Sequence, residues 1–352
     1  YDFAAPDLGT LVHAVLRCIG ERLLEEGRPW RELKDDEILS LCTVETERAA
    51  AEAANNILMS DAYFRQIKNR VVATLVRTVR QLRDFSEGSE FSVRALEQPF
   101  GTKGAWEGLS FNLPDGVKVE LVGQIDRVDT LELDGRTFIL IVDYKSGKKS
   151  ITLPEVYSGL ELQLFLYMAV ARRNLGSKAV PAGAVYCRVR NDVQRCSAEP
   201  TAAEKERAYI KAGQLSGFYL NDSDVVRALD DCTMEGRAAS PYSGLKINND
   251  GTLKKAANVS DEAEWYRLLR LVEAAACRSA SELTGGCIDI YPARWGSSNE
   301  HKACDYCPYA ALCRFDVTAE DGNSWNYLGN LSIDDLFPDT VIVKDGGQDG
   351  VD

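Results

Sequence analysis

The feature that most restricts the fold of this chain is a predicted β-hairpin at residues 120–147. Its sequence, ELVGQIDRVDTLELDGRTFILIVDYKSG, holds two strand-like runs joined by Asp134 and Gly135. An Asp-Gly pair between two such runs is the strongest short-range signal for a two-residue hairpin turn. With these residues in the turn, counting back along both strands brings Asp126 opposite Asp143.

The register also decides which side chains share a face. Because side chains alternate along a strand, Asp126 and Asp143 project to the same face of the hairpin. Gln124 and Lys145, two positions further along each strand, join them there. The two aspartates fall at a non-hydrogen-bonded pair, where facing side chains lie closest. A bulge between the turn and this pair would shift the register.

Two facing carboxylates indicate a cation site. They repel each other, and a divalent cation between them, such as Mg²⁺ with its preference for oxygen ligands, removes the repulsion. Asp143 ends an apolar run, Phe-Ile-Leu-Ile-Val, that is typical of a strand buried on both faces, so its charge needs a partner or a metal. Lys145 is placed to orient a water and to offset charge on a phosphate. The alternative is a surface hairpin with ordinary exposed ion pairs.

The charge balance excludes some classes of protein. The 352 residues include 41 Lys+Arg and 54 Asp+Glu, which gives a net charge of −13. This argues against a protein that coats nucleic acid through bulk positive charge, but not against an enzyme with a local metal site. No apolar run approaches the ~18–20 residues of a membrane span, and no signal peptide is visible, so we expect a cytoplasmic protein without membrane contact. The sequence contains no Walker A motif, so we expect no ATP site in this chain.

The periodicity of apolar residues predicts a mixed α/β protein. Helical spacing predicts helices at 8–27, within 31–85, and at 153–175, 200–235 and 259–284. A period of two predicts strands within 91–147 and at 183–190. Asp7 is the expected N-cap of the first helix, while Gly27 and Gly176 are expected to end helices. The order of elements predicts a central mixed β-sheet flanked by helices.

The D-x16-D-x-K pattern of Asp126, Asp143 and Lys145 resembles the PD-(D/E)xK nuclease superfamily, most closely its RecB-type branch. Matching segments occur in order at GTLVH (9–13), EQPFG (97–101), GQIDRVD (123–129), VDYKSG (142–147), GLELQLFLYMAVA (159–171) and C-x2-C-x-Y-x3-C-x-F-D (304–316). The last segment is similar to the C-terminal nuclease domain of the B subunit of bacterial AddAB-type helicase–nucleases. Each motif is weak alone, but together they cover nearly the whole chain.

The resemblance implies a restriction-endonuclease-like α/β core with a helical insertion and a C-terminal Cys cluster. The implied segments are a first core helix with a metal-ligand histidine (1–27), a helical insertion (28–90), the nuclease core (91–195), a helical region (196–285), the Cys-cluster segment (286–316) and a C-terminal tail (317–352).

The resemblance also implies the reaction, which is metal-dependent hydrolysis of DNA by a deoxyribonuclease, an exonuclease in particular. The implied ligands of Mg²⁺ or Mn²⁺ are His13, Asp126, Asp143 and the backbone carbonyl of Tyr144. The implied catalytic residues are Asp126, Asp143, Lys145, Gln163 and Tyr167. From the residues alone, a lone helical histidine is more often structural, and Gln163 and Tyr167, which are i, i+4 neighbours, also suit the polar edge of an amphipathic helix.

Three further charged residues have two interpretations each. Glu97 is either an outer acid of the site or an ordinary charge on an edge strand. Lys148 and Lys149 directly follow the hairpin motif, and either hold backbone phosphates or belong to a solvated turn.

The ten cysteines form two groups. Seven are scattered, and we expect buried free thiols at Cys18, Cys42, Cys187, Cys196, Cys232, Cys277 and Cys287. The other three, Cys304, Cys307 and Cys313, are clustered as in a metal site, and with His301 their spacing also suits zinc.

The resemblance implies instead that the clustered cysteines hold a [4Fe–4S] cluster whose fourth cysteine lies upstream of the first helix. The chain opens at Tyr1 and no Cys precedes Cys18, which suggests a fragment whose fourth ligand lies outside this chain. We therefore expect the cluster in the full-length protein, and absent or poorly bound in the fragment.

The resemblance finally implies a heterodimer with a helicase–nuclease A subunit that delivers one DNA strand during double-strand-break repair and recombination. Any ATP dependence would come from a missing N-terminal part or from that partner. Two other hypotheses remain. The chain is either a catalytically silent module that binds DNA and scaffolds the complex, or a freestanding RecB-like exonuclease with a zinc or iron–sulfur clasp.

Overall fold

The computed structural model describes residues 5–53, 62–102, 104–114, 116–147, 149–189, 199–231, 233, 239–251, 253, 258–296, 301–318 and 324–328. The chain divides into two compact units. The first comprises Tyr1–Ile151 and Gln163–Trp265, and the second comprises Thr152–Leu162 and Tyr266–Asp352. None of the helices in the described ranges has the length and apolar content that a membrane span requires.

The first unit contains the central sheet. Its helices are α1 (Ala5–Glu25), η1 (Trp30–Glu32), α2 (Asp35–Ala53), α3 (Ala62–Glu87), α5 (Gln163–Leu175), α6 (Ala202–Gly213) and α7 (Ser223–Leu229). Its strands are β1 (Ser92–Phe100), β2 (Ser110–Asn112), β3 (Lys118–Glu120), β4 (Gly123–Leu133), β5 (Arg136–Lys145), β6 (Ala179–Arg188), β7 (Ser216–Leu220) and β8 (Val259–Ser260).

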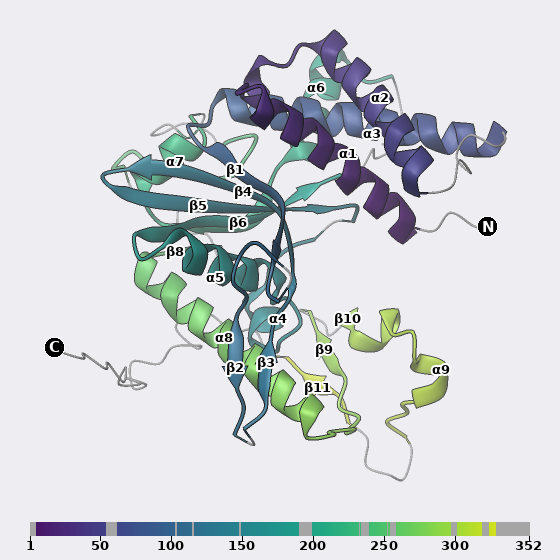
Figure 1. Cartoon of the computed structure of the whole chain (residues 1–352), viewed down its shortest axis with the longest axis vertical. Helices are drawn as coiled ribbons and strands as arrows, with labels where there is room; N and C mark the ends of the chain where they lie inside the picture. Colours follow the sequence, from purple (N-terminus) through teal and green to yellow (C-terminus); the bar gives the residue numbers. More distant parts are fainter. Residues whose placement is uncertain are drawn as a thin grey trace. The chain divides into compact units, whose positions relative to one another are not determined.

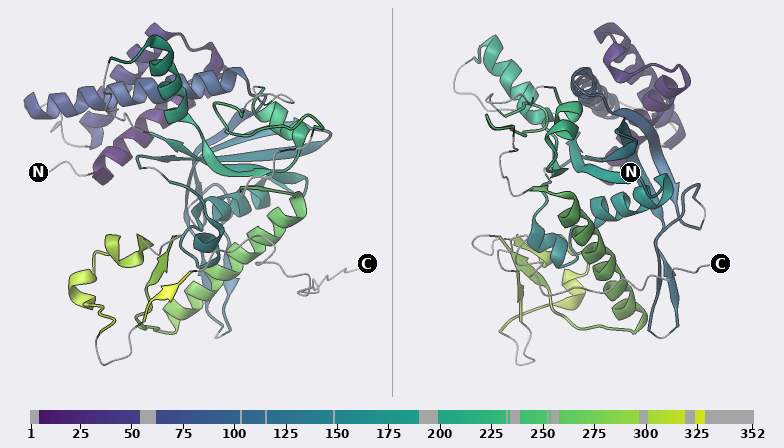
Figure 2. Two further views of the ribbon diagram at one scale, coloured as in Figure 1. Left: turned by 180° about the vertical axis from the view of Figure 1, so that it is seen from behind. Right: turned by 90° about the vertical axis from the view of Figure 1, so that its left-hand side faces the viewer.

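Six of these strands form one mixed sheet in the order β1-β4-β5-β6-β7-β8. The pairs β5–β6 and β7–β8 are parallel and the other neighbours are antiparallel. Both ribbon views show α1, α2 and α3 over one face of the sheet and α5 on the other (Figures 1 and 2). The predicted class, a central mixed sheet flanked by helices, is therefore confirmed.

The hairpin has the predicted register. β4 pairs with β5 from Leu133 opposite Arg136 to Arg127 opposite Val142, with no shift between them. Asp134 and Gly135 have φ of 51° and 70°, as a type I′ turn requires. The predicted alternation of faces therefore holds up to the pair that precedes Asp126.

On the face of the sheet that α1, α2 and α3 cover, β4 carries a buried ion pair. The guanidinium of Arg127 donates to the carboxylate of Asp129 from Nη2 (2.7 Å) and from Nε (2.8 Å), and the two side chains are only 4% and 2% exposed. The guanidinium also lies over the ring of Trp30, 5.2 Å from its centre. These residues stand at odd positions of β4, so they point away from the face of Asp126.

The opposite face is closed by aromatic side chains. Phe165 of α5, Phe218 of β7 and Trp265 of α8 (Glu262–Thr284) lie with ring centres 5.1–5.8 Å apart, and all three are fully buried. Rings of this size bury a large apolar area, so this cluster anchors α5 against the sheet.

The second unit consists of α4 (Leu153–Tyr157), α8 from Tyr266 onward, and a small Cys-containing segment. The segment contains β9 (Ala293–Trp295), β10 (His301–Lys302), η3 (Ala303–Tyr306), α9 (Ala310–Cys313) and β11 (Asn326–Tyr327).

Helix ends depart from the predictions at two places. α1 begins at Ala5, so Asp7 lies inside its first turn and is not the N-cap. The predicted helix at 153–175 is two helices, because Gly159 adopts φ of 81° and ends α4. There the amide of Leu160 donates to the carbonyl of Glu155, the contact of a Schellman cap. Gly27 ends α1 in the same manner, as predicted, with φ of 64°.

The predicted helical region at 200–235 contains a strand. β7 pairs antiparallel with β6 and parallel with β8. Gly217 in β7 lies so close to the neighbouring strand that an added Cβ would stand 2.3 Å from the carbonyl oxygen of Ala184. The close approach of two strands, which only a glycine permits, is a tertiary effect that helical periodicity does not register.

Candidate active site

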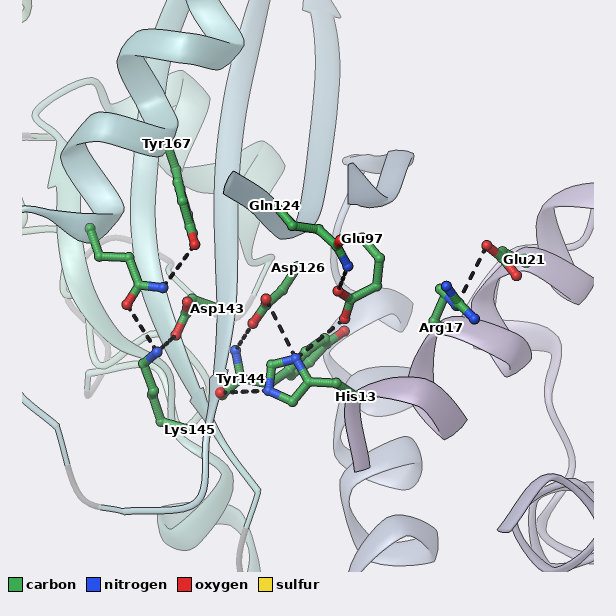
Figure 3. A network of polar contacts seen from close by, with 11 residues as sticks. His13, Arg17, Glu21, Glu97, Gln124, Asp126, Asp143, Tyr144, Lys145 and Tyr167 are labelled. Carbon is green, nitrogen blue, oxygen red and sulfur yellow. Dashed lines mark hydrogen bonds and ion pairs between the residues drawn. The ribbon is translucent and has the colours of Figure 1, made fainter. Parts of the chain in front are cut away.

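Two helices and three strands bring the predicted site residues together within the first unit (Figure 3). The contributing residues are His13 from α1, Glu97 from β1, Asp126 from β4, Asp143, Tyr144 and Lys145 from β5, and Gln163 and Tyr167 from α5. Figure 3 shows the two aspartates between the histidine on one side and the lysine on the other.

His13 faces three oxygen-bearing groups. Its Nδ1 lies 3.3 Å from Oε1 of Glu97 and 3.5 Å from Oδ1 of Asp126. Its Nε2 lies 3.2 Å from the backbone oxygen of Tyr144. Among the described residues, His13, Glu97 and Asp126 are the one group of three metal-ligating side chains whose ligand atoms all lie within 4.8 Å of one another.

The charge state of His13 reflects these neighbours. Burial lowers the pKa of its imidazole, but hydrogen bonds from the ring to Asp126 and Glu97, and the charges of those carboxylates, outweigh burial and raise the pKa to about 10. A protonated imidazole therefore occupies the place where carboxylates and a neutral histidine would hold a cation. Metal binding at this group must displace that proton.

Asp143 is the most deeply buried acid of the site, with a side chain only 1% exposed. Its Oδ2 forms an ion pair with Nζ of Lys145 at 2.8 Å, and its Oδ1 has no hydrogen-bond partner among the described residues. Burial, and then the charge of Asp126, raises the pKa of Asp143 to about 6. Asp126 itself accepts a hydrogen bond from the amide of Tyr144 at 2.8 Å. A buried carboxylate with one oxygen left without a hydrogen bond fits a cation ligand.

A chain of hydrogen bonds connects Lys145 to α5. Nζ of Lys145 donates to Oε1 of Gln163 at 3.0 Å, and Nε2 of Gln163 donates to the hydroxyl of Tyr167 at 2.9 Å. The i, i+4 spacing of Gln163 and Tyr167 puts both side chains on one face of the helix. Gln163 therefore presents its carbonyl oxygen to the lysine, because its amide group is engaged by the tyrosine.

Glu97 is the residue whose role the sequence left open. Besides His13 it contacts the side chain of Gln124, and it is only 10% exposed, so the interpretation as an ordinary edge-strand charge is wrong. Its φ of 43° lies in the left-handed region, a strained conformation that clusters at functional sites. No local sequence signal places it there: the pairing of Leu96 with Arg127 and of Gln98 with Ile125 sets Glu97 beside Asp126.

Lys149 is described and Lys148 lies outside the described residues, so the second of these lysines alone can be located. Lys149 is exposed, after the end of β5.

The scattered cysteines are only partly buried thiols. Cys42 and Cys187 are buried, Cys18 and Cys277 are half-buried, and Cys196 and Cys232 lie outside the described residues. Cys287 is exposed, so the expectation of burial is wrong there, because it lies beyond the end of α8.

The clustered cysteines lie in η3, directly after it, and at the end of α9. Cys304 is half-buried, whereas Cys307 and Cys313 are exposed. Burial, followed by the charges of Cys307 and Cys313, raises the pKa of Cys304. The amide of Cys307 donates to the carbonyl of Cys304, which folds the C-x2-C turn.

Comparison with known proteins places this geometry in a family. A family model described as the PD-(D/E)XK nuclease superfamily matches residues 1–314. The B subunit of the ATP-dependent helicase/deoxyribonuclease of Bacillus thuringiensis (strain Al Hakam) is 36% identical over 98% of this chain, and that of Bacillus anthracis is 35% identical over 98%. The chain spans 30% of the length of each relative. With the family match over residues 1–314, and with the acidic pair and lysine of the motif in one site, the chain belongs to the PD-(D/E)XK nuclease superfamily.

Proposed function

We propose that this chain is the nuclease part of a bacterial cytoplasmic helicase–nuclease, and that it hydrolyses phosphodiester bonds of DNA with Mg²⁺ or Mn²⁺. The observation that carries the proposal is the convergence of His13, Asp126 and Asp143 beside Lys145. DNA as substrate, a helicase A subunit as partner, and a role in double-strand-break repair belong to the same proposal. The names of the relatives, which this chain matches over part of their length, support DNA as substrate and a further subunit as partner, and the repair role follows from the family resemblance.

The donor set fits a divalent cation. His13, Glu97 and Asp126 lie within reach of one ion, and the backbone oxygen of Tyr144 lies next to His13. Oδ1 of Asp143, which has no hydrogen-bond partner among the described residues, offers a further oxygen on the neighbouring strand. A bound divalent cation would polarise the scissile phosphate and lower the pKa of a water molecule.

Lys145 supplies a positive charge at a defined place. Asp143 and Gln163 hold its ammonium group from two sides, at 2.8 Å and 3.0 Å. An ammonium group already oriented in this way needs little reorganisation to stabilise negative charge that develops on a phosphate. Gln163 and Tyr167 are therefore positioning residues, and Lys145 is the residue expected to touch the substrate.

The test is digestion of end-labelled single-stranded DNA by this chain with Mg²⁺, Mn²⁺ or EDTA. Asp143→Asn and Lys145→Ala should each lower the rate at least about 100-fold, the usual cost of removing one transition-state contact. Asp134→Asn is the matched control, because it also removes one carboxylate from the hairpin, but at the turn, where Asn tolerates the positive φ of 51°.

Unchanged digestion by Asp143→Asn would refute the proposed active site. Metal-independent binding without cleavage by the wild type would favour a silent scaffold.

We further propose that Cys304, Cys307 and Cys313 hold a [4Fe–4S] cluster with a fourth ligand from elsewhere in a longer protein. The C-x2-C-x5-C spacing and the turn that joins Cys304 to Cys307 support this proposal, since an iron–sulfur cluster binds thiolates. The test is iron and labile-sulfide analysis of the full-length protein and of this chain. Stoichiometric zinc in the full-length protein would contradict the proposal.

A further inference from the structure

A cavity of about 580 Å³ in the first unit lies next to the active site and shares Lys145 with it. The charged residues that line it are Lys145, Lys149, Arg188 and Lys211. None of the described residues along its wall is Asp or Glu. In a chain with a net charge of −13, a lining with four cations and no acid is a local reversal of charge.

The sheet makes this cavity continuous with the catalytic carboxylates. In the parallel pair β5–β6, Asp143 stands beside Tyr186 and Lys145 beside Arg188. In β6–β7, Tyr186 stands beside Ser216. Residues in register on neighbouring strands project to the same face, so one row of side chains leads from Asp143 into the cavity.

The lining of the cavity combines cationic side chains with small residues. The small residues include Ser216 and Gly217 of β7 and Ala212 of α6, beside the larger Tyr186 and Tyr219. Lys149 and Lys211 are exposed, whereas Arg188 is half-buried on the sheet. Long lysine side chains around a more fixed arginine suit an extended anion with several phosphates.

We propose that this cavity binds the phosphate backbone of a single DNA strand on one side of the scissile phosphate, with Lys149, Arg188 and Lys211 as phosphate-contacting residues. The inference rests on the proposed function, since it assigns the path of that substrate. A polymer must continue beyond the bond that is cut, and the shared Lys145 marks where it does so. A volume of about 580 Å³ is that of a small-ligand site, which admits a short stretch of one strand and not a duplex.

The experiment measures binding of a labelled single strand of about 20 nucleotides, longer than the site sizes typical of such grooves, by fluorescence anisotropy in EDTA. The salt concentration is varied between about 50 and 200 mM, because each neutralised phosphate of a single strand contributes about 0.7 to the slope of log Kd against log salt. The variant is Lys149→Gln/Arg188→Gln/Lys211→Gln. Its slope should be lower than that of the wild type by about 2, from three contacts of about 0.7 each.

The matched control is Lys34→Gln/Lys118→Gln/Arg173→Gln, which changes the net charge by the same amount at exposed positions outside the cavity. Its slope should stay at the wild-type value. Lys149→Gln/Lys211→Gln alone, at two exposed positions, tests the same idea without touching the sheet and should lower the slope by about 1.4. Equal slopes for the cavity variants and the wild type, or an equal drop in the control, would overturn the inference.

Cleavage separates this inference from the proposed function. In Mg²⁺, the cavity variants should keep the wild-type kcat at saturating strand and show a raised KM when the strand concentration is varied. Asp143→Asn should lose cleavage but keep the wild-type salt slope of binding. If the wild type cleaves no DNA but the slopes differ as described, the nuclease proposal fails and the cavity assignment stands. If the wild type cleaves and the slopes are equal, the cavity assignment alone fails.

Discussion

Removing the carboxylate of Asp129 should destabilise the protein far more than removing both members of its ion pair. The guanidinium of Arg127 is 4% exposed and donates three hydrogen bonds to that carboxylate, at 2.7, 2.8 and 3.0 Å. In Asp129→Ala the guanidinium stays charged and buried without its counter-ion. In Arg127→Met/Asp129→Leu no charge remains to be solvated.

The magnitudes follow from this difference. Breaking a buried pair on one side costs about 3–5 kcal/mol, while replacing both sides with apolar residues is often neutral or stabilising. The double variant also loses the contact of Arg127 with the Trp30 ring, which is worth up to about 2 kcal/mol when desolvated. We therefore expect Asp129→Ala to lose about 3–5 kcal/mol of a total that is typically 5–15, and the double variant to stay within about 2 kcal/mol of the wild type.

The assay is urea unfolding followed by circular dichroism, with all variants compared as a double-mutant cycle. With an m-value of at most about 3 kcal/mol/M, the midpoint of Asp129→Ala should fall by at least about 1 M urea. Asp129→Asn, which keeps an acceptor but not the charge, should lie between. If Asp129→Ala costs under about 1 kcal/mol, or the double variant is as unstable as the single one, the reasoning is refuted.

Three further outcomes are expected. Gln163→Leu removes the acceptor of Lys145, and since hydrogen bonds to charged groups are worth about 1.5–3 kcal/mol, kcat/KM should fall about 10- to 100-fold; an unchanged value would contradict the positioning role. The pKa of His13, lowered by burial but raised to about 10 by its carboxylate neighbours, means that Mg²⁺ binding should release a proton and strengthen as the pH rises towards 10. Calorimetry in buffers of different ionisation enthalpy measures that release. Mg²⁺ binding without proton release would count against His13 as a ligand. Burial raises the pKa of Cys42 to about 12, so iodoacetamide should label exposed Cys287 and spare Cys42 in the folded protein, as read by peptide mass spectrometry.

The hairpin could be predicted because all its information is local. Asp134 and Gly135 set the turn, and the turn sets every pair up to Arg127 with Val142. The meeting of Asp126 and Asp143 with Lys145 follows from alternation alone. Which of these side chains bind a metal stays a prediction.

Features that depend on distant segments were not predictable in this way. The place of Glu97 beside Asp126 depends on how β1 pairs with β4, and no turn signal sets that register. β7 has five residues, too few for a periodic signal, and is a strand because β6 and β8 flank it. Gly159, by contrast, was a local signal for the break between α4 and α5, since glycine inside a helix costs about 1 kcal/mol.

The two faces of β4 also bear on how this strand can change over evolution. Asp126 faces the candidate active site, and Arg127 and Asp129 form a buried pair on the reverse side. Deleting or inserting one residue between them and the turn would exchange the faces, which would turn the arginine into the site and bury the lone aspartate. Substitutions along β4 can be selected one at a time, but a change in its length alters both faces at once. Insertions and deletions should therefore accumulate in pairs, or beyond the ends of the strand.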